Sequence, residues 1–240
     1  DVRYIDNIVN GKGIGTILGY AGNQGILAFL IESPGILHGC NNYERRVVGS
    51  MICITTYYDY LKENLDEAKA IITAEQQRIC DAGKTFEESD LLSLELAKTK
   101  HEEFAYQTPY YHAATGEIKE MRTLIPEVWD TVVRSRVAPT AYVLPAGESW
   151  VADVLTIMDR HGISYTKLAA GTTVMLRQYI GSNTQAALTE EQPVTFPEGG
   201  YVFTMNTQKA EILANLLEPD MTITARTLTS GNGYYTATSG

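Results

Sequence analysis

The sequence has few cysteines: three in 240 residues, at positions 40, 53 and 80. Three scattered cysteines are too few for the disulfide framework of a small secreted domain, and they lack the C-x-x-C spacing of a structural zinc site. We interpret Cys40, Cys53 and Cys80 as small hydrophobic side chains of the core. The sequence therefore favours a fold that is held by ordinary apolar packing.

Basic residues are also scarce, with 19 Lys and Arg against 29 Asp and Glu, and a formal net charge of -10. A phosphate backbone would be repelled by this charge, and no basic cluster offsets it, so the composition argues against nucleic acid as a partner. No apolar run reaches the roughly 20 residues of a membrane-spanning helix, and no charged leader precedes a short apolar segment. We expect a soluble protein without a membrane partner.

Metal-binding and nucleophile motifs are missing as well. The spacings His-x-x-Glu and His-x-x-x-His do not occur, so the chain by itself offers no metal ligands that we can identify. We expect surface roles for His101 and His112, and we place His161 at the end of a helix, where a cation suits the dipole. No Ser lies in G-x-S-x-G, and a Ser33–His38 dyad is only a weak alternative.

The first part of the chain, residues 1–83, contains a long helix. Its apolar stripe predicts packing against a core. We expect a start at Asn41 or Asn42, a break near Gly49 or Asn64, and a stop at residues 81–83. The stripe recurs at steps of four and three: Val47, Met51, Ile54, Tyr58, Leu61, Leu65, Ala68 and Ile72.

The remaining chain divides into three parts. Residues 84–138 form a connecting region, in which FEESDLLSLELAKTK favours a helix and the residues around Pro109 favour a loop or an edge strand. Residues 139–221 predict a small α/β domain with strands at TAYVLP, ISYTKL, TTVMLRQYI and GYVFTM. Its first helix is capped by Ser149 and ends at Gly162, and its second runs from 207 to 217. Residues 222–240 are a tail.

One carboxylate stands out, because Glu32 follows the apolar run from Ile26 to Ile31. Such a run predicts a buried strand, and ligands of α/β folds bind where strands end. A partly desolvated carboxylate there has a raised pKa and suits general acid or base chemistry. The alternative, which the residues alone favour, is a structural ion pair between Glu32 and Arg45 or Arg46.

Two stretches resemble known sequences. The run GYAGNQGILAFLIESPGILHG, followed by NNYERRV, resembles the last third of the catalytic domain of zinc carboxypeptidases. In that family an Asn-Gln-Gly turn leads into a buried strand that ends in the general-base glutamate. The segments APTAYVLPAG, MDRHGISYTKL and GYVFTMNTQKAEILANLLEPD resemble the accessory domain that follows the catalytic domain in bacterial members.

This resemblance implies a fold and a set of residue roles. The fold would be the C-terminal part of a carboxypeptidase-like three-layer α/β domain, followed by a small separate α/β domain. Glu32 would be the general base that activates zinc-bound water. Tyr20, or Tyr4, would be the tyrosine that closes over substrate, while Leu18 and Gly19 would line the specificity pocket.

The same resemblance implies that the chain acts as part of a longer enzyme. The zinc ligands and the arginine that binds the substrate carboxylate belong to the N-terminal half of the catalytic domain, which would precede Asp1. The substrate would be a peptide with a free C-terminus, and the enzyme would work outside the cell or in the envelope. The alternative is a non-catalytic binding or scaffold unit for a peptide, a glycan or a partner domain.

Overall fold

The long helical stretch is divided into two helices, α2 (Tyr43–Glu63) and α3 (Leu65–Ala82). The break falls at Asn64 and the second helix stops at Gly83, so both predictions are confirmed. Asn42 stands at the start of α2, but its side chain makes no capping hydrogen bond. Its backbone instead takes the left-handed conformation, with φ of 58°, which asparagine tolerates better than most residues.

The stripe on these helices does not face a core, contrary to the prediction. Met51, Ile54 and Tyr58 are exposed, and α2 buries none of its residues. The cysteine prediction also fails in part, because Cys53 is exposed and Cys80 is only partly buried. Periodicity identifies the apolar face of a helix, but it does not tell which element covers that face. No element covers it within the described part of the chain.

Residues 84–138 form a ribbon of strands and not the helix that FEESDLLSLELAKTK predicted. The ribbon strands are β1 (Val2–Asp6), β2 (Leu91–Lys100), β3 (Tyr106–Tyr111) and β4 (Ile118–Val137), with a 3-10 turn at Glu102–Phe104. β2 and β3 pair antiparallel with the two halves of β4, and β1 pairs with it in parallel. Of the two alternatives predicted around Pro109, a loop or an edge strand, the structure has the strand, β3.

Cross-strand pairing explains why the helical propensity of β2 is overridden. Leu, Glu, Ala and Lys form helices well, but here apolar and polar residues alternate and the 20-residue β4 supplies a partner along the whole strand. Leu92 is buried in the main core, whereas the neighbouring Leu91 is exposed. The pairing runs from Leu91 opposite Val137 to Lys100 opposite Glu127, with bulges on the way.

The C-terminal unit, residues 139–221, combines a sheet with two helices. Its elements are β5 (Ala141–Pro145), α4 (Val151–Arg160), β6 (Thr166–Leu168), β7 (Thr172–Ile180), β8 (Ala187–Leu188), β9 (Gln192–Phe196), β10 (Gly200–Thr204) and α5 (Ala210–Leu217). The sheet order is β6-β10-β5-β11-β7-β8, where β11 is Tyr235–Ala237 and β9 pairs with β7. All these pairings are antiparallel.

Most predictions for this unit are confirmed. The four predicted strands and both helices are present, and α4 buries Val151, Val154 and Met158. Gly162 follows the C-cap with φ of +63°, as a C′ glycine does. Ser149 is not the cap, because α4 starts from Trp150 without a side-chain capping bond. Strands β8 and β9 were not predicted.

One core joins three of the four predicted parts of the chain, residues 1–83, 84–138 and 139–221. It contains Ile79 of α3, Leu92 of β2 and the buried faces of α4 and α5, and Ile14 and Tyr20 pack against it. A second cluster, Val143, Leu176 and Phe196, lies within the C-terminal unit. The division at residues 84 and 139 stays a prediction about domains, although the core crosses both positions.

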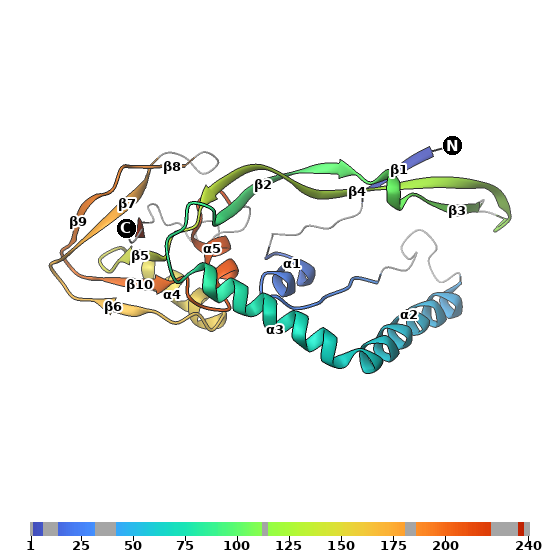
Figure 1. Cartoon of the computed structure of the whole chain (residues 1–240), viewed down its shortest axis with the longest axis horizontal. Coiled ribbons are helices and arrows are strands. Elements are labelled where there is room, and N and C mark those ends of the chain that lie inside the picture. The colour runs from blue at the N-terminus through green and yellow to red at the C-terminus, as the bar shows by residue number, and fades with distance from the viewer. Residues whose placement is uncertain are drawn as a thin grey trace.

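Figure 1 shows how these elements are arranged in the computed structural model, which describes residues 2–6, 14–31, 42–111, 115–180, 186–221 and 235–237. The C-terminal unit lies at one end. The ribbon and the helices α3 and α2 extend away from it in the same direction. The chain is mixed helix and strand, which confirms the general α/β class, while the three-layer carboxypeptidase-like arrangement stays a prediction.

Gly83 is where α3 meets the C-terminal unit, and we predict that it tolerates no side chain. A Cβ there would come within 2.1 Å of the backbone of Met205. We expect Gly83→Ala to lower the free energy of unfolding by about 1–3 kcal/mol, as overpacking does. The measurement is urea denaturation.

Gly49→Ala is the matched control, because a Cβ at this position in α2 meets nothing within 4 Å. We expect it to leave stability unchanged or to raise it by up to about 1 kcal/mol, since Gly disfavours a helix interior. Equal stability of the Gly83→Ala and wild-type proteins would contradict the close packing at Met205.

Candidate functional site

Three of the predicted site residues lie in one short helix, α1 (Ile17–Gly22). Thr16 starts this helix, and its Oγ1 accepts a hydrogen bond from the Gly19 N–H at 3.1 Å. Gly19 is buried, while Leu18 and Tyr20 are half-buried. Glu32 lies outside the described residues, which end at position 31 in this part of the chain.

A tight turn, Asn23–Gly25, follows α1 and is held by hydrogen bonds. Asn23 is buried, and its Nδ2 donates to the Gly19 carbonyl at 2.7 Å. Gln76 of α3 donates from Nε2 to the carbonyl of Gln24 at 3.2 Å. Gly25 has φ of +65°, and a Cβ there would crowd the side chains of α3. The Asn-Gln-Gly sequence therefore forms a turn that fits closely against α3.

The apolar run after this turn is not the buried strand that the sequence predicted. Residues 26–31 pair with no strand of the described chain, and five of the six are exposed. Phe29 is 64% exposed and Leu30 is 53% exposed. The apolar run predicted burial, but in the described structure these residues are mostly exposed. No covering layer is present among the described residues.

An apolar groove lies between this segment and the two long helices. Its volume is about 640 Å³, and Phe29 contacts Tyr57 with ring centroids 4.6 Å apart. The wall consists mainly of apolar side chains: Leu27, Phe29, Ile52, Leu61, Ala68 and Ile71. The groove therefore continues the apolar surface of the segment onto the faces of α2 and α3.

Tyr20 contacts the C-terminal unit. Its hydroxyl lies 3.0 Å from Nδ1 of His161, and the two rings are 5.4 Å apart. Lys209 donates from Nζ to the His161 carbonyl at 2.5 Å. Burial and the charge of Lys209 lower the pKa of His161, so the ring is neutral at pH 7 and not the helix-end cation that the sequence predicted. Tyr20 keeps its role at substrate only as a prediction.

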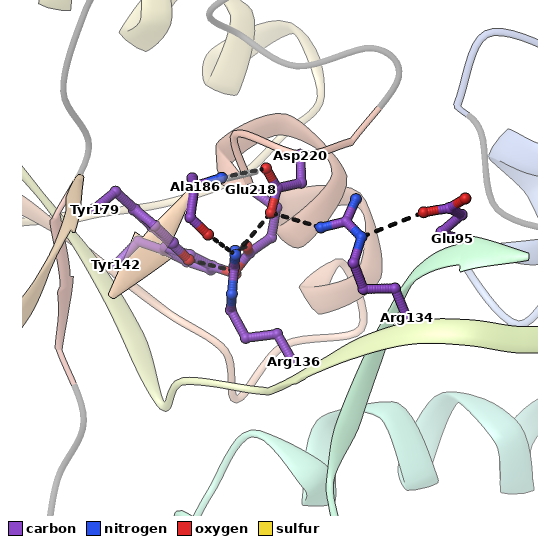
Figure 2. Close-up of polar contacts among 8 residues, drawn as sticks. All are labelled: Glu95, Arg134, Arg136, Tyr142, Tyr179, Ala186, Glu218 and Asp220. Carbon is purple, nitrogen blue, oxygen red and sulfur yellow. Dashed lines mark hydrogen bonds and ion pairs between the residues drawn. The ribbon is translucent and has the colours of Figure 1, made fainter. Parts of the chain in front are cut away.

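The most strongly ionic cluster lies where β4 meets the C-terminal unit (Figure 2). Glu218 accepts from Nη1 of Arg136 at 2.5 Å, and from the hydroxyls of Tyr142 and Tyr179 at 2.7 and 2.6 Å. Asp220 accepts from Arg136 at 2.7 Å and from Arg134 at 3.0 Å, and the two carboxylate side chains are fully buried. Arg134 also pairs with the exposed Glu95, its Nε donating to Oε2 at 3.3 Å.

The polar groups around Arg136 bond to one another and to the backbone of Ala186. Burial disfavours the charge of Arg136, but the carboxylates raise its pKa above the ordinary value. Burial, and then Glu218, raise the pKa of both tyrosines, which therefore stay protonated donors. Arg136 also donates to the Ala186 carbonyl, and Asp220 accepts from the Ala186 N–H. These mutual bonds make the cluster a structural clamp.

The sequence analysis did not identify this cluster. Arg134 and Arg136 lie two apart, so they share one face of a strand, but the sequence predicted no strand over residues 118–137. The carboxylates follow directly after the predicted second helix, in the segment Glu218-Pro219-Asp220. If β4 had been predicted as a strand, Arg134 and Arg136 would have been placed on one face of it. They would then have been candidate partners for Glu218 and Asp220.

A third polar group lies on the ribbon, where the predicted surface role of His101 is partly confirmed. Nδ1 of His101 lies 2.7 Å from Oε1 of Glu103, and Nε2 lies 2.6 Å from Oδ2 of Asp130. The ring stacks on Phe104. These two contacts raise the pKa of His101, since each ring nitrogen donates to a carboxylate when the ring is protonated.

The described residues contain no group of three His, Cys, Asp or Glu side chains that could hold a metal ion. The prediction that the zinc ligands belong to polypeptide preceding Asp1 stays a proposal. Among helices in the described ranges, none combines the length and apolar character that crossing a membrane requires.

Comparisons with protein-family models, with curated proteins and with solved structures found no match to this chain.

We predict that the Arg136 clamp is required for stability. Arg136→Met leaves two buried carboxylates short of their main cation, and we expect a loss of about 3–5 kcal/mol in the free energy of unfolding. Arg78→Met is the control, because Arg78 pairs with Glu75 at the surface and we expect its loss to cost about 1 kcal/mol or less. Similar denaturation midpoints for both variants would rule out the clamp.

His101 gives a pH-dependent prediction. Its pKa is raised in the folded chain, so its contribution to stability is complete below the unfolded value of about 6.5 and is lost as pH rises through the folded value. An NMR titration should give a pKa above 6.5. Asp130→Asn and Glu103→Gln should each lower it, while Glu102→Gln should not. A wild-type pKa at or below 6.5 would refute the two bonds.

Proposed function

We propose that the chain is the C-terminal part of a zinc-dependent metallocarboxypeptidase, with Glu32 as its general base. The observation that carries this proposal is the apolar run of residues 26–31, which lies exposed and without a strand partner in the described structure and leads directly to Glu32. In an isolated unit this exposure is unfavourable, by roughly 25 cal/mol for each Å² of apolar surface. Such exposure of apolar residues is expected where part of a domain lacks the part that covers it.

The backbone of residues 26–31 indicates which kind of structure would cover them. From Leu27 to Ile31 the main chain is neither helix nor strand, and none of its groups pairs in a described strand ladder. Buried backbone groups need hydrogen-bond partners, and neighbouring β-strands would supply them for a segment that is not helical. The partner is therefore a sheet, which in this proposal belongs to the N-terminal half of the catalytic domain.

The helices supply the second argument for an incomplete domain. The apolar groove and the exposed stripe of α2 and α3 lie beside the same segment, as a helical layer does beside a sheet. Large exposed apolar patches mark interaction surfaces in soluble proteins. One sheet against this surface would bury the segment and the helices together.

The catalytic roles follow the resemblance. As the resemblance implies, the metal ligands would belong to upstream polypeptide. Glu32 accepts a proton from the water that attacks the peptide carbonyl and passes it to the departing amine. The substrate is a peptide with a free C-terminus. Leu18, Gly19 and Tyr20, on α1, stay candidates for the pocket, and the enzyme works outside the cell or in the envelope.

The test compares the full-length protein with its Glu32→Gln variant, in the presence of zinc and a blocked dipeptide. We expect the variant to lose a factor of about 10²–10⁴ in kcat, which is the usual contribution of a general base. Glu190→Gln is the matched control, because Glu190 is an exposed carboxylate of the C-terminal unit. Equal hydrolysis by wild type and Glu32→Gln would exclude the proposed role of Glu32, and no hydrolysis by wild type would favour the scaffold alternative.

A further inference from the structure

The C-terminal unit contacts the turn that precedes the apolar segment, and we propose that it positions this segment for catalysis. Asn215 and His161 would then be positioning residues, although they lie far along the chain from Glu32. This inference rests on the proposed function. It goes beyond that function by giving the accessory unit a role in the rate of peptide hydrolysis.

The first contact is a buried amide chain. Asn215 lies in α5 and is 2% exposed; its Nδ2 donates to the Glu211 carbonyl at 2.8 Å and lies 3.4 Å from Oδ1 of Asn23. Asn23 in turn donates to the Gly19 carbonyl. Because buried amides are costly without partners, each asparagine fixes the orientation of the other. α5 is thereby connected to α1 through the turn.

The second contact is independent of the first and comes from another helix. His161, at the C-terminal end of α4, pairs with the Tyr20 hydroxyl. Lys209 bonds to the His161 carbonyl and so ties the end of α4 to the start of α5. Two separate elements of the C-terminal unit therefore contact α1, one at Tyr20 and one at the turn.

The turn is also fixed from the opposite side by α3, through the bond from Gln76 to the Gln24 carbonyl. The Ile26 N–H then donates to the Ala21 carbonyl at 3.0 Å, so the first residue of the segment is bonded to α1 itself. The direction in which the segment leaves the turn depends on α1. Because α1 is held by α4 and α5, this direction depends on the C-terminal unit.

Small displacements at the turn have large effects at the end of the segment. Residues 26–31 lead from the turn directly to Glu32, so a shift of the turn is passed on to this segment. A misplacement of about 1 Å can cost on the order of 10²-fold in rate. The contacts at the turn therefore have the leverage to control kcat.

The first experiment measures hydrogen exchange at the turn in the chain itself. In Asn215→Ala and His161→Phe, we expect the amides of Gln24, Gly25 and Ile26 to exchange at least about tenfold faster than in wild type. Leu176→Ala is the control, because Leu176 is fully buried in the second cluster of the C-terminal unit and has no part in the turn. Unchanged exchange in the two turn variants would overturn the inference.

The second experiment measures kinetics of the full-length enzyme at a temperature at which all variants are folded. We expect Asn215→Ala and His161→Phe to lower kcat by about 10- to 100-fold, with KM changed less than about twofold. Leu176→Ala should change neither constant. A purely structural role would lower activity equally in all three variants, which would also overturn the inference.

The outcomes separate this inference from the proposed function. If wild type hydrolyses the peptide, Glu32→Gln does not, and the turn variants keep the wild-type kcat, then the proposed function stands and the positioning role is wrong. If wild type is inactive, both fail. Lower kcat in the turn variants alone, with faster exchange at the turn, supports the positioning role.

Discussion

Burial of α5 is the constraint on which the rest of the structure depends. Seven of its eight residues are buried, so this helix is apolar on almost all sides and has to lie in the centre of a core. The sheet of the C-terminal unit, α4, α3 and β2 all contribute to that core. Two buried polar side chains interrupt this apolar surface, and both are paired. Asn215 bonds with Asn23 in the turn after α1, and Glu218 bonds with Arg136 of the ribbon.

The two ends of the molecule therefore differ in how far their apolar side chains are buried. Around α5 the apolar side chains are buried and the charged groups are paired. Along α2 and residues 26–31 the same kinds of apolar side chain lie exposed. α5 is apolar on almost all sides, whereas α2 carries polar residues between its apolar ones, so composition as well as the available partners separates the two regions. The proposed enzyme explains the difference, because its upstream half would cover the exposed surface.

Sequence patterns predicted elements better than they predicted environments. The break at Asn64, the helix α4 and the strand at residues 141–145 follow from local chemistry, and all three were predicted correctly. β2 was missed because its residues favour a helix, and only the long partner β4 makes a strand of them. The run from Ile26 to Ile31 predicted burial, but a pattern cannot tell whether the covering layer is present. The Arg136 cluster required the register of β4, which no local pattern contains.

The central claim is that residues 26–31 become a strand of a sheet supplied by upstream polypeptide. The direct measurement is hydrogen exchange of the amides from Leu27 to Ile31, in this chain alone and in the full-length protein. The account predicts fast exchange in the chain alone and protection of these amides by a factor of at least about 10³ in the full-length protein, as in a core strand. Equally fast exchange in both proteins would contradict it.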